Sequence, residues 1–565
     1  MIISIRSNNL VIVVGGGGAA CRAALEAAEN GAQVLMILKG KIGKSGATSY
    51  KVAEMAGFNV ADGQVDPNDS PEEHYKDIIN AGYGMADPTL ARIVAEEAPQ
   101  TLRTLSSWGV PFEMEDGHFY EFLSCFSTRP RTHVIKGHGE PIMDVLIKRI
   151  RKIDQIFIYE DSVVTNLFIQ DGECVGVGLI DNKGKYKTVS AGAVILATGG
   201  AGQLFARNLN PADICGDGYT LGFEAGAELV NLEFMQVGLG IVFPIINILN
   251  AWIWSAHPTL TNKYGKSFLC NYLPNGVSSE EVMNTHSHHF PFSSADLSRY
   301  LELAIQGELV KDCGTDKGGV YLDLTKITDK YLENLSPNDD FRKMWPITRN
   351  YLLEKGVDVE KSQVQIACFA HAINGGLKIN SQAQTTIPGL YAAGEVAGGP
   401  HGADRLGGNM MVTCQIFGAR AGRFAAEEAL KKGRIELSTG SVKNEYDRIQ
   451  NLIGREIEVE NLKKRLQDNA QSKLLVRRDV TSLESFLDTI NQLRFEIKQS
   501  SSAKLNRKVW GLHSLLTIGE LMANAALFRQ ESRGSHFRTD YSKSNDKFIK
   551  PFTIIRSSNR KPKIS

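Results

Sequence analysis

The chain has 565 residues, of which 42% are hydrophobic and 22% are charged, and 63 Lys and Arg residues balance 63 Asp and Glu residues. This composition is typical of a folded globular protein and argues against general disorder. The zero net charge lacks the basic excess that binds nucleic acid or an anionic membrane, so we expect neither as a partner. Glycine is abundant, at 54 residues, and clustered glycine is typical of backbone that approaches a ligand closely.

The amino-terminal region predicts the first half of a dinucleotide-binding unit. The apolar run at 10–14 is typical of a strand buried on both faces. A glycine-rich turn at 15–20, a helical pattern over 21–30 and a second apolar strand at 34–38 follow it. In a turn of the form GxGxxA, the second glycine lets backbone N–H groups reach a pyrophosphate at the start of the helix. The acid expected after the second strand is missing, and Lys39 stands in its place.

Two later segments predict further strands of the same sheet. Residues 193–200 read AVILATGG, and residues 388–395 read PGLYAAGE, which places Glu395 at the carboxyl end of a strand. Open α/β sheets bind their ligands at that edge. Three strand–glycine units spread over 400 residues indicate a discontinuous nucleotide-binding domain, interrupted at about 232–365 and followed by a helical region at about 435–535.

One uncharged apolar run, residues 237–256, has the length of a membrane-spanning helix. Pro244, Asn247 and Asn250 interrupt it, so we favour a buried strand and loop that line a pocket, with a spanning helix as the alternative. The last ten residues, 556–565, are basic and polar and predict a frayed tail.

The eight cysteines are scattered and form no CxxC pair. This spacing predicts no zinc site, no iron–sulfur cluster and no disulfide framework within the chain. We expect an intracellular, cytoplasmic protein without a membrane span.

Seven motifs in a fixed order carry a resemblance to a known family. They are VVGGGGAA (13–20), KSGAT (44–48), LATGG (196–200), GDGYTLGFEAGAEL (216–229), HAINGGLKI (371–379), GLYAAGEVAGGPHGADRLGGN (389–409) and QESRGSHFRTDY (530–541). With these motifs the chain resembles, from about residue 10 to 550, the flavoprotein subunits of succinate dehydrogenase and fumarate reductase, together with L-aspartate oxidase and adenylylsulfate reductase.

The resemblance implies an α/β fold in three parts. A Rossmann-like FAD-binding domain would cover residues 8–231 and 366–434, an inserted α+β capping domain 232–365, and a C-terminal helical domain 435–550.

The resemblance also implies which residues hold FAD. The glycines at 15, 17 and 18 would hold the pyrophosphate, the segment 45–48 would line the flavin ring, and Glu395 would bind ribityl or ribose hydroxyls. Backbone N–H groups at 407–409 would face the flavin pyrimidine edge, where negative charge collects on reduction. The full implied set is Gly15, Gly17, Gly18, Ala19, Lys39, Ser45, Gly46, Ala47, Thr48, Thr198, Gly199, Asp217, Glu395, Gly408, Asn409 and Met410.

We expect the FAD to be non-covalent. Members of the family with covalent flavin carry a histidine in the segment that matches residues 45–49, and this chain has none there.

On the substrate side, the family holds a carboxylate between a histidine and an arginine that match His371 and Arg405. A guanidinium and an imidazole together form a charge-assisted clamp that can orient a carboxylate against the flavin. A structural role for His371, as a hydrogen-bonded histidine near a turn, is the alternative.

Two other family residues are absent. The substrate histidine matches Gly238, and the proton-shuttling arginine matches Ala295. An insertion could deliver His257 to the first place, and Arg299, one helical turn further on, could reach the second. We therefore expect a substrate other than succinate or fumarate. The predicted catalytic residues are Arg405, His371 and Arg299, although Asp296 or a tyrosine of the cap could also act as acid or base.

The capping region is rich in aromatic residues, which are more typical of a core but would also suit a larger, less polar substrate. They are Trp252, Trp254, Tyr264, Phe268, Tyr272, Phe290, Phe292 and Tyr300. The His286–His289 run is typical of a solvated loop, and no metal site is predicted.

These features predict an FAD-dependent oxidoreductase that moves a hydride between flavin N5 and a carbon of a carboxylate-bearing small molecule. Amine or amino-acid oxidation with a substrate that is not a dicarboxylate is one specific version. The alternative is an electron-relay subunit of a larger complex with a lost substrate site. Family members pass electrons either to an iron–sulfur subunit or to oxygen, and the sequence leaves this choice open.

Overall fold

The computed structural model describes residues 8–50, 55–337 and 339–565. Its centre is a five-stranded parallel sheet in the order β20 (Leu390–Ala392), β12 (Ala193–Leu196), β1 (Leu10–Val14), β2 (Gln33–Ile37) and β8 (Ile156–Tyr159). All residues of β1 are buried, as expected of a strand covered on both faces. The predicted strands at 10–14, 34–38 and 193–200 and the predicted α/β fold class are confirmed.

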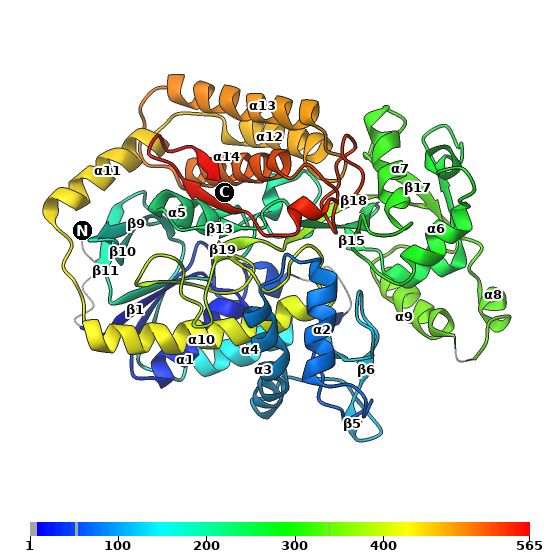
Figure 1. The fold of residues 1–565 in the computed structure, drawn as a ribbon, viewed down its shortest axis with the longest axis horizontal. Helices are drawn as coiled ribbons and strands as arrows, with labels where there is room; N and C mark the ends of the chain where they lie inside the picture. Colours follow the sequence, from blue (N-terminus) through cyan, green and yellow to red (C-terminus); the bar gives the residue numbers. More distant parts are fainter. Residues whose placement is uncertain (1–7, 51–54, 338) are drawn as a thin grey trace.

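Two helices cover one face of this sheet (Figure 1). Helix α1 (Gly18–Glu29) follows the glycine turn, and the long helix α10 (Asn409–Lys432) packs directly against it. Their backbones approach so closely that a Cβ on Gly422 would lie 2.4 Å from the Ala23 carbonyl oxygen. The antiparallel sheet β11 (Tyr186–Ser190), β10 (Glu173–Ile180) and β9 (Val163–Gln170) lies across the central sheet from α10.

The region between residues 232 and 365 forms the green part at the right of Figure 1. Its sheet has the order β15 (Asn247–Ile248), β14 (Met235–Phe243), β18 (Val364–Ile373), β17 (Val320–Asp323) and β16 (Thr259–Thr261). Its helices are α6 (Ser279–His286), α7 (Arg299–Val310), α8 (Asp329–Glu333) and α9 (Asp340–Glu354). The predicted boundary between residues 365 and 366 falls inside β18, and the domain limits stay predictions.

The uncharged run at 237–256 is a strand and a loop, as favoured from the sequence. It contains most of β14, then β15, then a 3₁₀ helix, η3 (Ala251–Ala256). Within the described ranges, no helix is long and apolar enough to cross a membrane.

Four helices form the upper layer of Figure 1: α11 (Thr439–Ile453), α12 (Val459–Lys473), α13 (Val480–Gln499) and α14 (Arg507–Phe528). Helix α14 is buried along most of its length, while α13 buries only one face. The helical patterns expected at 483–497 and 515–530 lie in α13 and α14. Beneath them lies α5 (Asp217–Ala225), which contacts α14.

The remaining elements surround the central sheet. They are β3 (Met55–Asn59), β4 (Met114–Glu115), β5 (His118–Phe119), β6 (Glu121–Phe122), β7 (Thr132–Lys136), α2 (Pro71–Gly82), α3 (Pro88–Ser107) and α4 (Glu140–Ile150).

The prediction of a frayed tail at 556–565 is wrong. Strands β22 (Thr553–Arg556) and β23 (Pro562–Ile564) form a hairpin, and β22 pairs with β13 (Leu229–Val230). The hairpin thereby completes a five-stranded sheet with β19 (Gly376–Lys378) and β21 (Ala397–Gly398). Backbone pairing with a distant strand, together with the buried Ile554 side chain, overrides the polar composition of the segment.

Candidate active site

A cavity of about 450 Å³ lies at the carboxyl ends of β1, β2, β12 and β20 and is also lined by residues of β15 and β18. This volume lies within the usual range of small-molecule and cofactor sites. The edge is the one at which open α/β sheets bind ligands. Every predicted cofactor-binding residue except Asn409 lines this cavity, and so do His371 and Arg405.

The glycine turn after β1 lets neighbouring backbone and a ligand come close to the chain. Gly15 has φ +131°, and a Cβ there would lie 2.1 Å from the Ala197 carbonyl oxygen, so only glycine fits where β1 and β12 end side by side. Gly17 caps α1 without a side-chain hydrogen bond, and no acidic residue lies in the first turn of the helix. The start of α1 therefore presents backbone N–H groups and a positive dipole end to the cavity, as a pyrophosphate requires.

Lys39 stands where an acid was expected. It forms a charged cluster with Asp213 and Asp217. Its Nζ donates to Asp217 Oδ2 at 2.8 Å and to the Asp213 carbonyl oxygen at 3.3 Å. The Asp213 carboxylate in turn accepts from the Gly46 N–H at 2.9 Å. The nearby carboxylates raise the pKa of Lys39 although burial opposes them, so the lysine stays charged and ties the segment 45–48 to the start of α5.

Unpartnered polar atoms in the cavity match a cofactor that carries hydroxyl groups. Thr198 Oγ1 and Asp217 Oδ1 are buried and have no hydrogen-bond partner, yet both residues line the cavity. Buried polar atoms are costly unless they are paired, and ribose or ribityl hydroxyls can donate to both. The residues present therefore fit FAD.

Glu395 follows β20 at the same edge of the sheet. Its Oε1 accepts from the Ile373 N–H at 2.9 Å. Burial raises its pKa to about 7, although this hydrogen bond and the Arg405 charge favour the carboxylate. A carboxyl group in this position can accept hydrogen bonds from cofactor hydroxyls.

The turn before α10 is held by side chains that the sequence did not point to. Gly408 has φ +82°, and a Cβ there would lie 2.5 Å from Asn59 Oδ1. Asn409 Oδ1 accepts from Asn59 Nδ2 at 2.9 Å and lies 3.0 Å from His74 Nε2. Burial lowers the pKa of His74 to about 3, so its neutral ring can donate to the Asn409 amide oxygen. The Asn409 side chain thus positions the turn, while Gly407, Gly408 and Met410 line the cavity.

Arg405 and His371 lie together in the cavity. The Arg405 Nε donates to Gln236 Oε1 at 2.9 Å and its Nη1 to the Leu406 carbonyl oxygen at 2.8 Å. Its Nη2 lies 3.5 Å from His371 Nε2. Burial and the Arg405 charge lower the pKa of His371 to about 3, and burial lowers that of Arg405 to about 10. At pH 7 the pair is therefore a neutral imidazole beside a charged guanidinium.

The space of the missing family histidine is filled by an aromatic ring. A Cβ on Gly238 would lie 2.1 Å from Phe290 Cζ. Phe290 lines the cavity and packs edge-to-face on His371, with ring centroids 5.7 Å apart. His257 lies elsewhere, because its Nε2 is 2.7 Å from Asn284 Oδ1 and the residue does not line the cavity.

The structure does not bring Arg299 to the cavity. Its guanidinium donates to the Ser294 carbonyl oxygen at 2.6 Å and to the Tyr300 hydroxyl at 3.3 Å. Asp296 is also outside the cavity and bonds His289 at 3.0 Å. Sequence reasoning missed Cys125, His138 and His288, which do line the cavity, because no motif marks them.

The prediction of a solvated loop at 286–289 is wrong for His286 and His289, whereas His288 is exposed and lies in a turn. His286 ends α6 and lies 2.6 Å from Glu302 Oε1, and His289 lies 2.8 Å from the Pro291 carbonyl oxygen. Both rings are buried because each finds polar partners inside the cap, which lowers the cost of burial. In the described part of the chain, no group of three His, Cys, Asp or Glu residues could hold a metal ion.

Known proteins and protein families match this chain over nearly its whole length. Residues 11–411 match the FAD binding domain family, and residues 463–565 match the fumarate reductase flavoprotein C-terminal family. The chain is 30% identical to one of the subunits of fumarate reductase (CoM/CoB) from Methanothermobacter marburgensis, over 95% of both chains. It is 27% identical to L-aspartate oxidase of Bacillus subtilis, over 84% of this chain and 82% of that protein.

Among solved structures, Mycobacterium smegmatis Sdh1 in complex with UQ1 superposes with a TM-score of 0.82 at 26% identity, covering 98% of this chain and 93% of that one. E. coli quinol fumarate reductase FrdA shares the fold, with a TM-score of 0.81 at 24% identity over 98% and 95% of the two chains. These matches support FAD as the cofactor. The chain therefore belongs to the FAD-dependent oxidoreductases of the succinate dehydrogenase and fumarate reductase flavoprotein family, which includes the L-aspartate oxidases.

Proposed function

We propose that this oxidoreductase transfers a hydride between FAD and a carbon of a small molecule that carries one carboxylate, held by Arg405 and His371. FAD, when bound, supplies the hydride acceptor or donor. The chain's own residues supply the rest: an anion clamp, an apolar wall that selects the remainder of the substrate, and a group that moves a proton.

The observation that carries this proposal is the buried charge of Arg405, which has no ion-pair partner among the described residues. The residue is 6% exposed, and its guanidinium contacts a neutral amide, a backbone carbonyl and a neutral imidazole. Among the described residues, no carboxylate lies within 4.0 Å of its guanidinium. A buried, unpaired charge is costly, and a substrate carboxylate beside Arg405 and His371 would remove that cost.

The wall of the cavity near the clamp supports a monocarboxylate rather than a dicarboxylate. Phe290 fills the space beside Gly238, and Leu209, Ile248 and Trp252 also line the cavity. Such a surface favours an apolar group and offers no second clamp of the Arg405 kind. Because one relative is named a fumarate reductase, the experiment described below also includes fumarate and succinate.

We assign the proton-moving role to His371. Of the groups considered from the sequence, Arg299 and Asp296 lie outside the cavity and no tyrosine of the cap lines it, whereas His371 does. Its neutral ring can accept a proton, and a bound carboxylate would raise its pKa toward the working range of an acid or base.

An electron-relay role within a larger complex is the second candidate. Two observations favour it: Phe290 occupies the space of a substrate histidine, and a relative over 95% of this chain is named as one part of a multi-subunit enzyme. A relay protein would exchange electrons with a partner, such as an iron–sulfur subunit, without binding a carboxylate at Arg405.

Arg405→Gln and Arg405→Lys separate the two candidates. We would follow the flavin spectrum anaerobically, adding succinate, L-aspartate or 3-phenylpropionate to oxidised protein, and fumarate, crotonate or cinnamate to dithionite-reduced protein. We expect a monocarboxylate to change the spectrum. Arg405→Gln should lower kcat/KM for it roughly 100-fold or more, and Arg405→Lys should lose less, because it keeps the charge.

Flavin content and reduction by dithionite should not change in either variant. A full rate in Arg405→Gln would overturn the clamp. A flavin spectrum that none of these acids changes in the wild-type protein, although dithionite reduces it, would favour the relay. A full rate of the wild-type protein with succinate or fumarate would overturn the proposed substrate class. Reoxidation of reduced flavin in air would identify oxygen as an acceptor, and its absence would favour a partner protein.

A further inference from the structure

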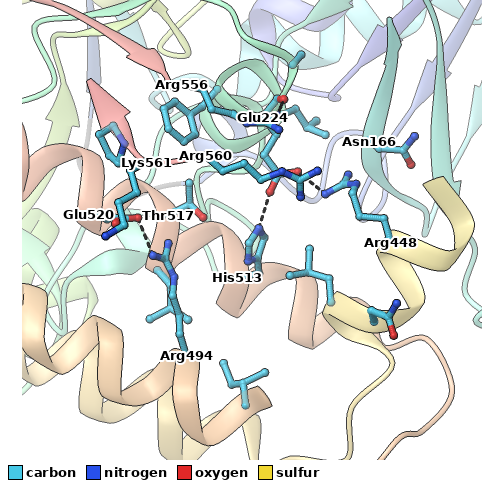
Figure 2. Close-up of a pocket in the computed structure, with 18 of the residues that line it drawn as sticks. Asn166, Glu224, Arg448, Arg494, His513, Thr517, Glu520, Arg556, Arg560 and Lys561 are labelled. Atoms are coloured by element: carbon cyan, nitrogen blue, oxygen red, sulfur yellow. Dashed lines mark hydrogen bonds and ion pairs between the residues drawn. The ribbon is translucent and has the colours of Figure 1, made fainter. Parts of the chain in front are cut away.

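A second, larger cavity of about 1240 Å³ lies between the upper helices and the C-terminal hairpin (Figure 2). Residues of β9, α5, α11, α13, α14 and the β22–β23 hairpin line it. It is separate from the FAD cavity, and Leu221 of α5 is the single residue, among those described, that lines both. On the same helix, Asp217 faces the FAD cavity and Glu224 the second one.

Positive charge dominates the walls of this cavity. Seven Lys and Arg side chains line it against three glutamates, although the whole chain has no net charge. The cations are Arg448, Arg455, Arg494, Lys498, Arg556, Arg560 and Lys561, and the glutamates are Glu224, Glu445 and Glu520.

The three glutamates are already engaged by the inner cations. Glu224 accepts from Arg448 at 2.8 Å and lies 2.8 Å from His513 Nε2. Arg448 also donates to Glu445 at 2.8 Å, and Arg494 donates to Glu520 at 2.7 Å. These contacts hold two guanidinium groups in place at the base of the cavity.

The hairpin then adds three more cations, Arg556, Arg560 and Lys561. Arg556 donates to the Glu224 backbone oxygen. Burial and the neighbouring Arg560 and Arg448 charges lower the pKa of Arg556, although the Glu224 and Glu445 carboxylates oppose this shift. No carboxylate of the described residues lies within 4.0 Å of Arg560 or Lys561, and Figure 2 shows the Arg560 and Arg448 guanidinium groups converging beside Glu224. Like charges gathered in this way repel one another. The Glu224 carboxylate, which already pairs with Arg448 and His513, offsets only part of this repulsion.

We propose that this cavity is a binding site for a small multivalent oxyanion, a molecule with at least two phosphoryl or carboxylate groups. Guanidinium groups bind such oxygens through paired, charge-assisted hydrogen bonds. Arg448 and Arg494 would supply fixed donors, and the exposed Arg560 and Lys561 at the rim would fold over the ligand. Leu452, Leu487 and Ile490 form an apolar part of the lining that can pack on a short carbon skeleton.

The test is isothermal titration calorimetry of the FAD-loaded full chain with pyrophosphate and with citrate at about 150 mM salt, where long-range attraction is screened. We expect saturable binding of one molecule per chain, and the tighter of the two probes identifies the phosphoryl or carboxylate class. Arg560→Gln with Lys561→Gln should weaken binding by about tenfold or more. The control pair, Lys136→Gln with Lys361→Gln, removes two exposed charges away from the cavity and should leave affinity unchanged.

Equal weakening in the control pair, or no saturable binding of either probe at millimolar concentration, would overturn the proposal. Binding of an oligoglutamate peptide without binding of either probe would also overturn it, in favour of a protein partner. A second measurement does not depend on the variants. Pyrophosphate should slow amide hydrogen exchange in residues 441–455 and 553–564 of the wild-type protein, and unchanged exchange would contradict the site.

Discussion

Glu395 shows how a single side chain couples the FAD cavity to pH. Its carboxyl group has one backbone donor, the Ile373 N–H, and burial raises its pKa from 4.5 to about 7. The folded protein therefore binds a proton more tightly than the unfolded chain does. In the FAD-free protein, the stabilisation from this proton is complete below about pH 4.5 and is lost as the pH rises through about 7.

We predict that Glu395→Gln removes this loss, because an uncharged amide still accepts the Ile373 hydrogen bond. In FAD-free protein, the thermal midpoint of Glu395→Gln minus that of wild type should rise between pH 5 and pH 8. Burial also raises the pKa of Asp404 to about 7. Both proteins contain Asp404, so its contribution to the pH dependence cancels in the difference between their thermal midpoints. The exposed Glu427→Gln is the control, and a constant difference across this pH range would contradict the prediction.

Single residues also show what local sequence can and cannot predict. Arg405, His371 and Glu395 could be predicted because short motifs surround them. Their partners could not be predicted, since Gln236 lies 169 positions from Arg405 and Asn59 lies 350 positions from Asn409. Only the folded chain brings such pairs together, and the partners carry no motif of their own.

At the scale of elements, the C-terminal hairpin stabilises a sheet rather than forming a loose tail. Strand β22 pairs with β13 on one side and β23 on the other, and Ile554 is 1% exposed. Truncating a buried isoleucine to alanine removes about 2–5 kcal/mol of packing free energy.

We predict that Ile554→Ala lowers the thermal midpoint and speeds hydrogen exchange in residues 553–564. The matched control is Ile549→Ala, whose side chain is 49% exposed and whose truncation should change stability by no more than about 0.5 kcal/mol. A thermal midpoint of Ile554→Ala that is no lower than that of Ile549→Ala would contradict the prediction.

The elements differ in how far sequence could predict them. β1, β2 and β12 could be predicted from their apolar runs, because a strand buried on both faces carries its own signal. The hairpin has strands of four and three residues in a polar segment, and its partner β13 lies more than 300 positions earlier. Its existence depends on that long-range pairing, which no local pattern reports.

At the scale of the whole molecule, the predicted cofactor-binding residues that line the FAD cavity come from three distant stretches: residues 15–48, 198–217 and 395–410. This explains why the family resemblance, which needs all the motifs in order, predicted the cavity well. The second cavity had no such signal. Its cations come from α11 and the loop after it, from α13 and from the C-terminal hairpin, and the balanced net charge of the chain conceals them.

We predict that FAD is bound without a covalent link. Acid precipitation of the loaded protein should leave all the flavin in the supernatant. The segment 45–49 contains no histidine, but His138, His288 and His371 do line the cavity. Flavin that stays in the pellet would contradict the prediction, and substitution of each histidine would then identify the attachment site.

Helix α5 has nine residues and contributes to the lining of both cavities. Thermodynamic linkage makes any coupling between the two cavities reciprocal. If a bound anion changes the affinity for FAD by some factor, bound FAD changes the affinity for the anion by the same factor. The ratio of the pyrophosphate dissociation constants with and without FAD would measure the same coupling as the ratio of the FAD dissociation constants with and without pyrophosphate. If the two ratios differ from one, the supply of the anion sets how much of the enzyme carries its flavin, and the flavin sets how much of the anion the enzyme retains.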